Sequence, residues 1–263
     1  MSVIKIIVAT HKEFVMPQDK ELYLPIHVGC EGKKDLGFQG DNTGDNISIL
    51  NPYYCELTGL YWAWKNLECD YLGLVHYRRY FTKKAEVYNK SINIDDVILD
   101  KDDIEKLLEV SNVIVPKKRK YYIETLYSHY AHTLDGTHLD LARKMIEMKS
   151  PEYLSSFDKV MKQRSGYMFN MFIMKKELAD DYFTWLFPIL DSMYECMDLS
   201  GLTAFEARLF GRVSELLFNV WLVKNNLTPT EAHFMYMEKV NLFKKGLSFL
   251  QAKFLGKKYG KSF

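Results

Sequence analysis

Two adjacent arginines, Arg78 and Arg79, have the side-chain chemistry and the position along the chain to bind a phosphate group. They follow an apolar run, residues 71–75, whose short length, β-prone composition and polar flanks predict a buried strand. An open α/β sheet places its ligand at the carboxyl ends of its parallel strands. Two guanidinium groups at such an end offer fixed, fork-shaped donors for phosphate oxygens, although pairing with nearby acids would explain them equally well.

Two further predicted strands also end in polar side chains. The run 3–9 is followed by a Thr-His-Lys segment, and the run 113–115 by a basic cluster at 117–120. Because the carboxyl ends of parallel strands lie along one edge of a sheet, we expect these groups to converge on one ligand. Besides the basic cluster, the residues expected at this edge are Thr10, His11, Lys12, His76, Tyr77, Arg78 and Arg79.

A polar loop at 37–48 contains two Asp-Asn pairs, Asp41 with Asn42 and Asp45 with Asn46. Their carboxylate and amide groups have the chemistry to contact a base or a ribose. Asx side chains also build turns by bonding their own backbone, and that interpretation stays open for this loop. The loop and the basic strand ends together predict a nucleotide-diphosphate ligand that is held mainly by basic residues.

The motifs of several nucleotide-binding classes are missing from the sequence. It has neither a G-x-x-x-x-G-K-[ST] phosphate loop nor a G-x-G-x-x-G after the first strand, which excludes P-loop kinases and Rossmann dehydrogenases. The Asp-x-Asp formed by Asp100 and Asp102 opens a predicted helix, where N-capping explains it better than metal binding. His129, His132 and His138 match no standard metal-ligand spacing and are expected on a helix face. We therefore expect no divalent metal cofactor.

Two glutamates in the segment 202–222, Glu206 and Glu215, are candidates for a catalytic base. Gly211 interrupts the helical pattern, and Ser214 is a suitable cap for a helix that starts near Glu215. A carboxylate at such an N-terminus could accept a proton from a substrate, or it could simply compensate the helix dipole.

The elements that carry these residues alternate between strand and helix patterns, which predicts an α/β protein with helices packed on a sheet. The predicted strands of a mostly parallel sheet are 3–9, 23–28, 71–75, 113–115 and 168–174. The predicted helices are one that starts at Pro52 with Asn51 as its cap, then 103–110, 121–162 and two or three within 176–225. We expect one domain over 1–238 and a separate tail over 239–263.

Composition narrows the class of protein. The 263 residues are 48% hydrophobic with a net charge of +1, which fits one large domain and argues against a general nucleic-acid binder. The four cysteines lack any metal-ligand spacing and are expected to be reduced. The sequence shows neither a signal peptide nor a long apolar stretch, so a cytoplasmic location is expected.

The tail has its own character. Residues 239–263 contain seven lysines and no acidic residue, and four apolar residues recur there at helical spacing: Phe243, Leu247, Leu250 and Phe254. A basic amphipathic segment of this kind is typical of binding to an anionic membrane surface. The alternative is a C-terminal helix docked on the body of the protein, with its lysines in solvent.

Several segments together resemble a known family, the bacterial capsular and exopolysaccharide biosynthesis proteins long classed as a domain of unknown function. The resemblance runs in order from Ile4 to Leu222. The segments that carry it are 8–12 (VATHK), 41–47 (DNTGDNI), 51–57 (NPYYCEL), 61–66 (YWAWKN), 76–80 (HYRRY), 170–174 (NMFIM), 214–215 (SE) and 219–222 (NVWL).

The resemblance implies a GT-A-like glycosyltransferase with a mostly parallel central sheet and a helical C-terminal part. Some members of the family are linked to the transfer of galactofuranose from its uridine-diphosphate (UDP) sugar. We expect the acceptor to be a lipid-linked saccharide at the inner face of the plasma membrane. A non-catalytic subunit that binds nucleotide or polysaccharide is the alternative function.

In a GT-A fold the metal-binding Asp-x-Asp follows a central strand, and here the corresponding position holds the arginines. We therefore expect an inverting, metal-independent enzyme in which Arg78 and Arg79 neutralise the leaving diphosphate and Glu215 is the base. The expected donor-binding residues are Thr10, His11, Lys12, Asp41, Asn42, Asp45, Asn46, Tyr61, Lys65, His76, Tyr77 and Asn170.

Overall fold

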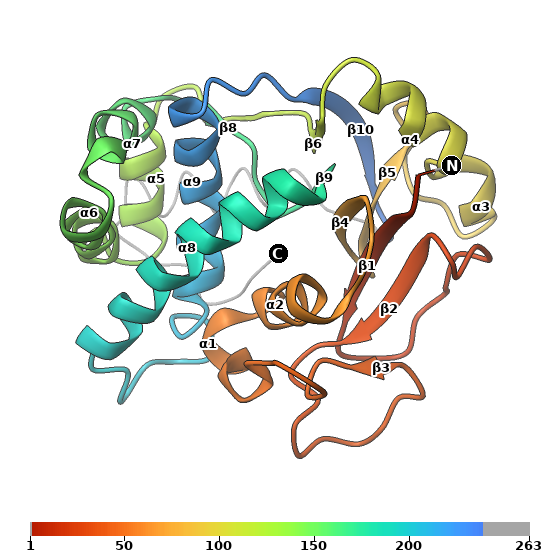
Figure 1. Ribbon diagram of the computed structural model, residues 1–263, viewed down its shortest axis with the longest axis horizontal. Helices are drawn as coiled ribbons and strands as arrows, with labels where there is room; N and C mark the ends of the chain where they lie inside the picture. The colour runs from red at the N-terminus through yellow and green to blue at the C-terminus, as the bar shows by residue number, and fades with distance from the viewer. Residues whose placement is uncertain (1, 239–263) are drawn as a thin grey trace. The chain divides into compact units, whose positions relative to one another are not determined.

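The computed structural model describes residues 2–238 (Figure 1), so the predicted basic tail lies outside the described part of the chain. The chain divides into two compact units. Of the described residues, unit 1 comprises 2–117, Phe169–Thr184 and 228–238, whereas unit 2 comprises Lys118–Met168 and Trp185–Leu227.

Unit 1 is built on an eight-stranded sheet with the order β3-β2-β1-β4-β5-β10-β6-β9. Its strands are β1 (Ile4–Thr10), β2 (Tyr23–His27), β3 (Gln39–Gly40), β4 (Tyr71–His76), β5 (Arg79–Thr82), β6 (Val113–Pro116), β9 (Phe172–Lys175) and β10 (Thr230–Tyr236). The predicted strands 3–9, 23–28, 71–75 and 113–115 correspond to β1, β2, β4 and β6 and are confirmed to within one or two residues. Strands β3, β5 and β10 were not predicted, and β9 begins four residues later than expected.

The sheet is mixed, which corrects the expectation of a mostly parallel one. Strand β1 pairs in parallel with β2 and β4, and β10 pairs in parallel with β6. Strand β9 is antiparallel to both β4 and β6, so β4 and β6 run in the same direction. The carboxyl ends of β1, β4 and β6 therefore lie at the same edge, as predicted.

Strand β4 has neighbours along its whole length. Its first four residues pair with β9, while His76 at its end pairs with Arg79 of β5. On the other side β1 pairs with all six residues, and Figure 1 shows β2, β1 and β4 side by side. Burial on both faces explains why β1 and β4 read as near-continuous apolar runs.

The helices of unit 1 are α1 (Asn51–Tyr54), α2 (Leu57–Asn66), α3 (Ile94–Val97), α4 (Lys101–Leu108) and the first part of α8 (Lys176–Cys196). The helix predicted from Pro52 is divided, because Cys55 takes a left-handed φ of 54° between α1 and α2. Asn51 does not act as its N-cap: its side chain donates to the Cys55 carbonyl at 2.8 Å, across the break. Helix α2 lies close on the sheet, since a Cβ at Gly59 would meet Val28 Cγ1 at 2.6 Å.

Unit 2 is mainly helical and contains α5 (Leu126–Thr133), α6 (Thr137–Lys149), α7 (Leu154–Met161), α9 (Leu209–Lys224) and the rest of α8. Two short 3-10 helices, Ser48–Leu50 in unit 1 and Pro151–Tyr153 in unit 2, complete the helical elements of the described chain. A two-stranded sheet pairs β7 (Arg119–Lys120) with β8 (Ser165–Gly166).

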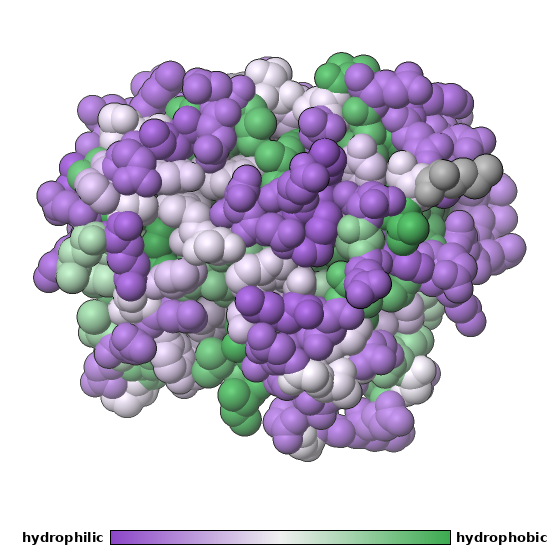
Figure 2. All heavy atoms as spheres, in the orientation of Figure 1, coloured by the Kyte–Doolittle hydropathy of each residue, from purple (hydrophilic) through white to green (hydrophobic). Residues whose placement is uncertain are grey.

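The surface seen in Figure 2 is largely hydrophilic, with hydrophobic residues as scattered spots among polar ones. Within residues 2–238, none of the helices combines the length and the apolar character that crossing a membrane requires. The apolar residues of unit 1 are instead gathered in a buried core around β1, β4, β5 and α4.

Candidate functional site

The carboxyl ends of β1 and β4 bring together most of the predicted phosphate-binding residues. Tyr77, in the turn between β4 and β5, is surrounded by cationic and aromatic groups. The ring of His11 meets it edge-on at 5.3 Å, Lys12 Nζ lies 5.1 Å from its centroid and Arg78 Cζ lies 5.4 Å from it. Cations over an aromatic face gain electrostatically from the ring without losing their charge, so this edge keeps its positive potential.

Arg79 is held by aromatic rings instead of by acids. Its guanidinium carbon lies 4.5 Å from the centroid of Phe169 and 5.3 Å from that of Tyr236. Within residues 2–238 it makes no ion pair, and its Nε atom is buried without a hydrogen-bond partner. Because no acid among residues 2–238 neutralises this guanidinium, its charge is suited to binding an anion.

Arg78 has a weaker internal partner. Its Nη1 atom lies 3.3 Å from Glu238 Oε1, and both side chains are substantially exposed to solvent. Exposed pairs of this kind contribute about 0–1 kcal/mol, so Glu238 is easily displaced by a more highly charged ligand.

His76, the last residue of β4, is neutral at physiological pH. Burial lowers its pKa to about 4, against the opposing influence of the Glu56 carboxylate, and Arg79 lowers it further. Its Nε2 lies 2.7 Å from the Phe169 carbonyl oxygen. Since a carbonyl can only accept, Nε2 carries the proton and Nδ1 is left as an acceptor.

A short turn before β9 holds three of these side chains. Phe169 and Asn170 both have left-handed φ values, 79° and 52°. The Phe169 carbonyl accepts from His76, the Phe169 ring contacts the Arg79 guanidinium, and the Asn170 amide donates to Glu56 Oε1 at 2.8 Å. Two successive left-handed non-glycine residues are unfavourable, and such strain is concentrated at functional sites.

Glu56 is the residue of this network that sequence reasoning did not assign. It lies between α1 and α2, within the segment 51–57 that resembles the family. The signal that could have found it is the broken helix, because the left-handed Cys55 turns Glu56 toward the end of β4. The predicted donor residue Asn170 reaches the site through this carboxylate.

Two residues that were predicted to bind the donor, Thr10 and Asp41, are instead hydrogen-bonded within the protein. Thr10 is fully buried, and its hydroxyl donates to the Lys12 carbonyl at 2.6 Å. Asp41 is also fully buried, and its carboxylate accepts from Gly29 N, Cys30 N and the hydroxyls of Ser48 and Thr58. With those four donors, Asp41 ties the loop to α2.

The rest of the polar loop is split between turns and exposed groups. Asn46 forms an Asx turn with Ser48 N, so the turn-building interpretation holds for this residue. Asn42 donates to Glu31 at 3.1 Å, and Asp45 accepts from Tyr61 at 3.1 Å. Both Asn42 and Asp45 are exposed, so their remaining polar capacity faces solvent.

Lys65 lies on the aromatic residues of α2. Its Nζ atom is 3.6 Å from the centroid of Trp64 and 5.6 Å from that of Tyr61. It remains exposed, and no ion pair involving it is found in the described part of the chain.

The predicted base, Glu215, belongs to unit 2, and its expected helix start is wrong. Helix α9 begins at Leu209, so Gly211, Ser214 and Glu215 are all inside it. The Ser214 hydroxyl donates to the Gly211 carbonyl at 2.8 Å instead of capping a helix. Glu206 accepts from the backbone and hydroxyl of Thr203, which is a local turn contact.

The acidic and histidine clusters have structural roles in the described chain. Asp100 caps α4 in a capping box with Asp103 and pairs with Lys83 at 2.6 Å, which confirms the capping interpretation. Within residues 2–238, no group of three or more His, Cys, Asp or Glu residues is placed to hold a metal.

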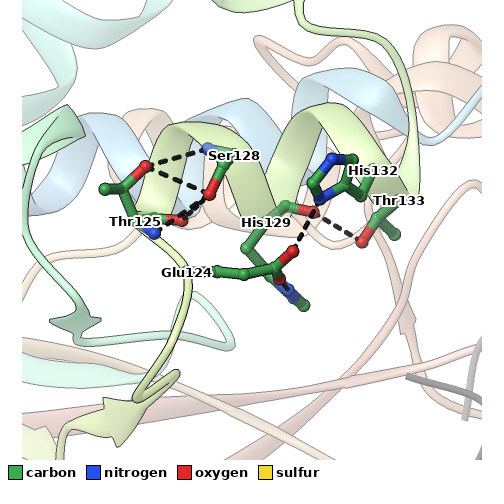
Figure 3. A network of polar contacts seen from close by, with 6 residues as sticks. All are labelled: Glu124, Thr125, Ser128, His129, His132 and Thr133. Carbon is green, nitrogen blue, oxygen red and sulfur yellow. Dashed lines mark hydrogen bonds and ion pairs between the residues drawn. The ribbon is translucent and has the colours of Figure 1, made fainter. Parts of the chain in front are cut away.

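Two of the three histidines hold a buried carboxylate in unit 2. Glu124 is 3% exposed and accepts from His132 Nδ1 at 2.6 Å and from His129 Nδ1 at 3.1 Å. Figure 3 shows the three side chains together. Burial alone would raise the pKa of Glu124, but these two hydrogen bonds outweigh it and the pKa lies below its usual value. Burial lowers the pKa of His129 to about 4. The third histidine, His138, is buried against the Tyr130 hydroxyl at 3.1 Å.

Comparison with known proteins adds a family and a structural relative. A family model described as "Domain of unknown function (DUF4422)" matches residues 5–226. A solved structure of the WbbM bifunctional glycosyltransferase, in its apo form, is similar with a TM-score of 0.82 and 30% sequence identity. The similarity covers 90% of this chain and 45% of that one, so this chain corresponds to less than half of the relative. No curated protein sequence matches the chain significantly. The mixed α/β fold is therefore shared with part of a glycosyltransferase.

Proposed function

This chain belongs to the DUF4422 family, and we propose that it is a glycosyltransferase that uses a nucleotide-diphosphate sugar. The observation that carries this proposal is the uncompensated guanidinium of Arg79 at the carboxyl end of β4. The similarity to part of a bifunctional glycosyltransferase supports the reaction class.

The leaving group in such a transfer is a nucleoside diphosphate, and its negative charge must be stabilised as the sugar departs. Arg79 supplies a fixed fork of donors, while Arg78 and Lys12 add charge around Tyr77. We propose that these cations replace the divalent ion of metal-dependent glycosyltransferases. Asp100 and Asp102 belong to the first turn of α4, where Asp100 is its cap.

The donor is proposed to be a UDP-sugar, with UDP-galactofuranose as the first to test. His11 and Tyr77 offer aromatic edges beside the cations, and the exposed Asn42 and Asp45 offer amide and carboxylate groups for the nucleoside. We propose a lipid-linked saccharide of capsule or exopolysaccharide synthesis as the acceptor, at the inner face of the plasma membrane.

An inverting transfer needs a base for the acceptor hydroxyl, and two carboxylates are in question. Glu215 is the predicted base. Glu56 is the carboxylate that the structure places in one network with His76, Asn170 and the turn that holds Arg79. A carboxylate whose orientation is fixed by an amide is suited to proton abstraction, because it need not reorganise.

The deciding experiment incubates the full chain with UDP-sugars and a lipid-linked acceptor analogue, with and without excess chelator. We expect UDP release coupled to formation of a glycosylated product, both unaffected by the chelator. A protein that binds donor and returns it unchanged would be the alternative, a non-catalytic binding subunit. Loss of activity with chelator and recovery with manganese or magnesium would contradict the metal-independent arginine mechanism. It would leave the proposed glycosyl transfer itself intact.

A further inference from the structure

Unit 2 carries a basic and apolar surface to which the proposed chemistry gives no role. It includes residues 118–120 of the basic cluster that was expected at the ligand edge, and that expectation stays a prediction. The surface is formed by β7, the turn that follows it and the residue before β8, and we name it the basic turn surface. Its members are Lys118, Arg119, Lys120, Tyr122, Ile123 and Arg164, all of them exposed.

The four cations of this surface have no acidic partner within residues 2–238. Lys118 Nζ lies 4.8 Å from the ring centroid of Tyr167, and Arg119 Cζ lies 5.2 Å from that of Tyr121. Arg164 donates to the backbone carbonyl of Tyr122 at 3.3 Å. These contacts orient the cations without neutralising their charge.

The acid that follows in the sequence is withdrawn from this surface. Glu124 is 3% exposed, and its two carboxylate oxygens are occupied by His129 and His132, as Figure 3 shows. Its negative charge is therefore held inside unit 2 by imidazole donors, and the turn presents an excess of positive charge to solvent.

The tip of the turn is apolar and is held in place. Tyr122 is 77% exposed and Ile123 is 53% exposed, which is unusual for neighbouring large side chains. Tyr122 takes a left-handed φ of 53°. The backbone on either side is fixed, since Tyr121 N donates to the Arg164 carbonyl at 2.8 Å and Ile123 N to the Tyr121 carbonyl at 2.6 Å. The turn thus holds two apolar side chains in water.

We propose that the basic turn surface docks this protein on an anionic membrane. Lysine and arginine near an anionic leaflet each gain about fivefold in binding, and an aromatic and an aliphatic side chain enter the headgroup region. A soluble polyanion would be bound by the cations alone and would give Tyr122 and Ile123 no apolar environment. The proposal is independent of the glycosyl-transfer chemistry and of the tail.

The test measures binding of the full chain to vesicles of phosphatidylcholine with and without phosphatidylglycerol. One variant combines Lys118→Glu with Lys120→Glu, and a second combines Tyr122→Ser with Ile123→Ser. Matched controls in α6 of the same unit are Lys144→Glu with Lys149→Glu, and Met148→Ser, since all three side chains are exposed. The tail is present in every protein, so differences report on the turn.

We expect the charge variant to bind anionic vesicles at least about tenfold more weakly and the apolar variant at least about threefold more weakly. The α6 controls should stay within about twofold of the wild type. An equal loss in the charge control would show that only net charge matters, and wild-type binding by the apolar variant would point to a soluble polyanion. Either result would overturn the proposal.

A second measurement does not require removal of any contact. Tyr122→Trp and Met148→Trp place an indole at the tip of the turn and at the control site. Vesicles that contain brominated lipid should quench the added fluorescence of the first variant and leave that of the second unchanged. Equal quenching of the two, or none in either, would contradict insertion of the turn.

Discussion

Arg78 and Arg79 are adjacent in sequence but differ in their surroundings. Arg79 lies between Phe169 and Tyr236 without an acidic partner among the described residues, whereas Arg78 has Glu238 at 3.3 Å. The two ring contacts restrict the Arg79 side chain, so less entropy is lost when it binds a phosphate. Arg79 should therefore matter more to transfer than Arg78.

We predict that Arg79→Ala lowers kcat/KM at least about tenfold, because a charge-assisted contact to phosphate contributes about 1.5–3 kcal/mol. Arg79→Lys should recover little, since an ammonium lacks the fork of donors that a guanidinium presents to a phosphate. Steady-state UDP release measures both variants. Arg143→Ala, which breaks the Arg143–Asp158 pair in unit 2, is the matched control and should keep wild-type activity. Full activity in Arg79→Ala would rule out the phosphate role.

Glutamine variants of Glu56 and Glu215 should show which of the two carboxylates is the base. If Glu56 accepts the acceptor proton, Glu56→Gln should reduce turnover by at least about 10²-fold while donor affinity stays near normal. Glu215→Gln would then retain most activity. The reverse pattern would return the base to α9, where sequence reasoning placed it.

Residue types in the sequence indicated the cationic edge, but they did not show which polar groups were already satisfied. Asp41 and Asp45 belong to similar Asp-Asn pairs, yet Asp41 accepts four internal donors while Asp45 is exposed. The difference depends on Gly29, Ser48 and Thr58, which the fold brings to Asp41. A sequence pattern does not contain that information.

At the scale of elements, the turn formed by Phe169 and Asn170 connects the site. The Phe169 carbonyl accepts from His76, and the Phe169 ring contacts Arg79. The Asn170 amide donates to Glu56. The left-handed backbone of the turn and its side-chain contacts can be tested independently of each other, because glycine accepts a positive φ and lacks the amide.

We predict that Asn170→Gly and Asn170→Ala lose activity to a similar extent, but that the alanine variant is the less stable of the two. Both lose the hydrogen bond to Glu56, so both should lower kcat by at least several-fold. Only the alanine must adopt a φ of 52° at a cost of about 1–2 kcal/mol, so it alone should unfold at clearly lower denaturant concentration. Equal midpoints of denaturation for the two variants would show that the left-handed conformation is not maintained.

The strands of the parallel part were predictable because β1 and β4 are buried on both faces and read as apolar runs. Strand β10 was missed since its burial alternates irregularly and its sequence, Thr-Glu-Ala-His-Phe-Met-Tyr, begins with polar residues. The division of the helix after Pro52 was also hidden. It depends on a left-handed Cys55, a conformation that residue type does not announce.

For the molecule as a whole, buried histidines predict the direction of its pH dependence. Burial lowers the pKa of both His76 and His129 to about 4, while an exposed histidine titrates near 6.5. Between these values the unfolded chain binds protons that the folded chain does not. The free energy of unfolding should therefore fall as the pH drops from about 6.5 to about 4.

Each histidine adds at most about 1.4 kcal/mol per pH unit to that slope. Denaturant titrations at a series of pH values should show it, and His129→Gln should remove about one proton from the slope. Unchanged pH dependence in His129→Gln would mean that this imidazole is already protonated in the folded protein. Lys144→Gln on the exposed face of α6 is the control and should leave the slope as it is.

Strand β4 has hydrogen-bonded neighbours on both sides, with β1 along one and β9 followed by β5 along the other. Its amide protons can then meet solvent only when several strands separate together, so we expect residues 72–75 to be among the slowest to exchange with deuterium. The arginine edge therefore follows directly on a strand whose backbone we expect to open rarely. Any closure over a bound substrate must come from the loops around it, while the cationic groups stay where they are.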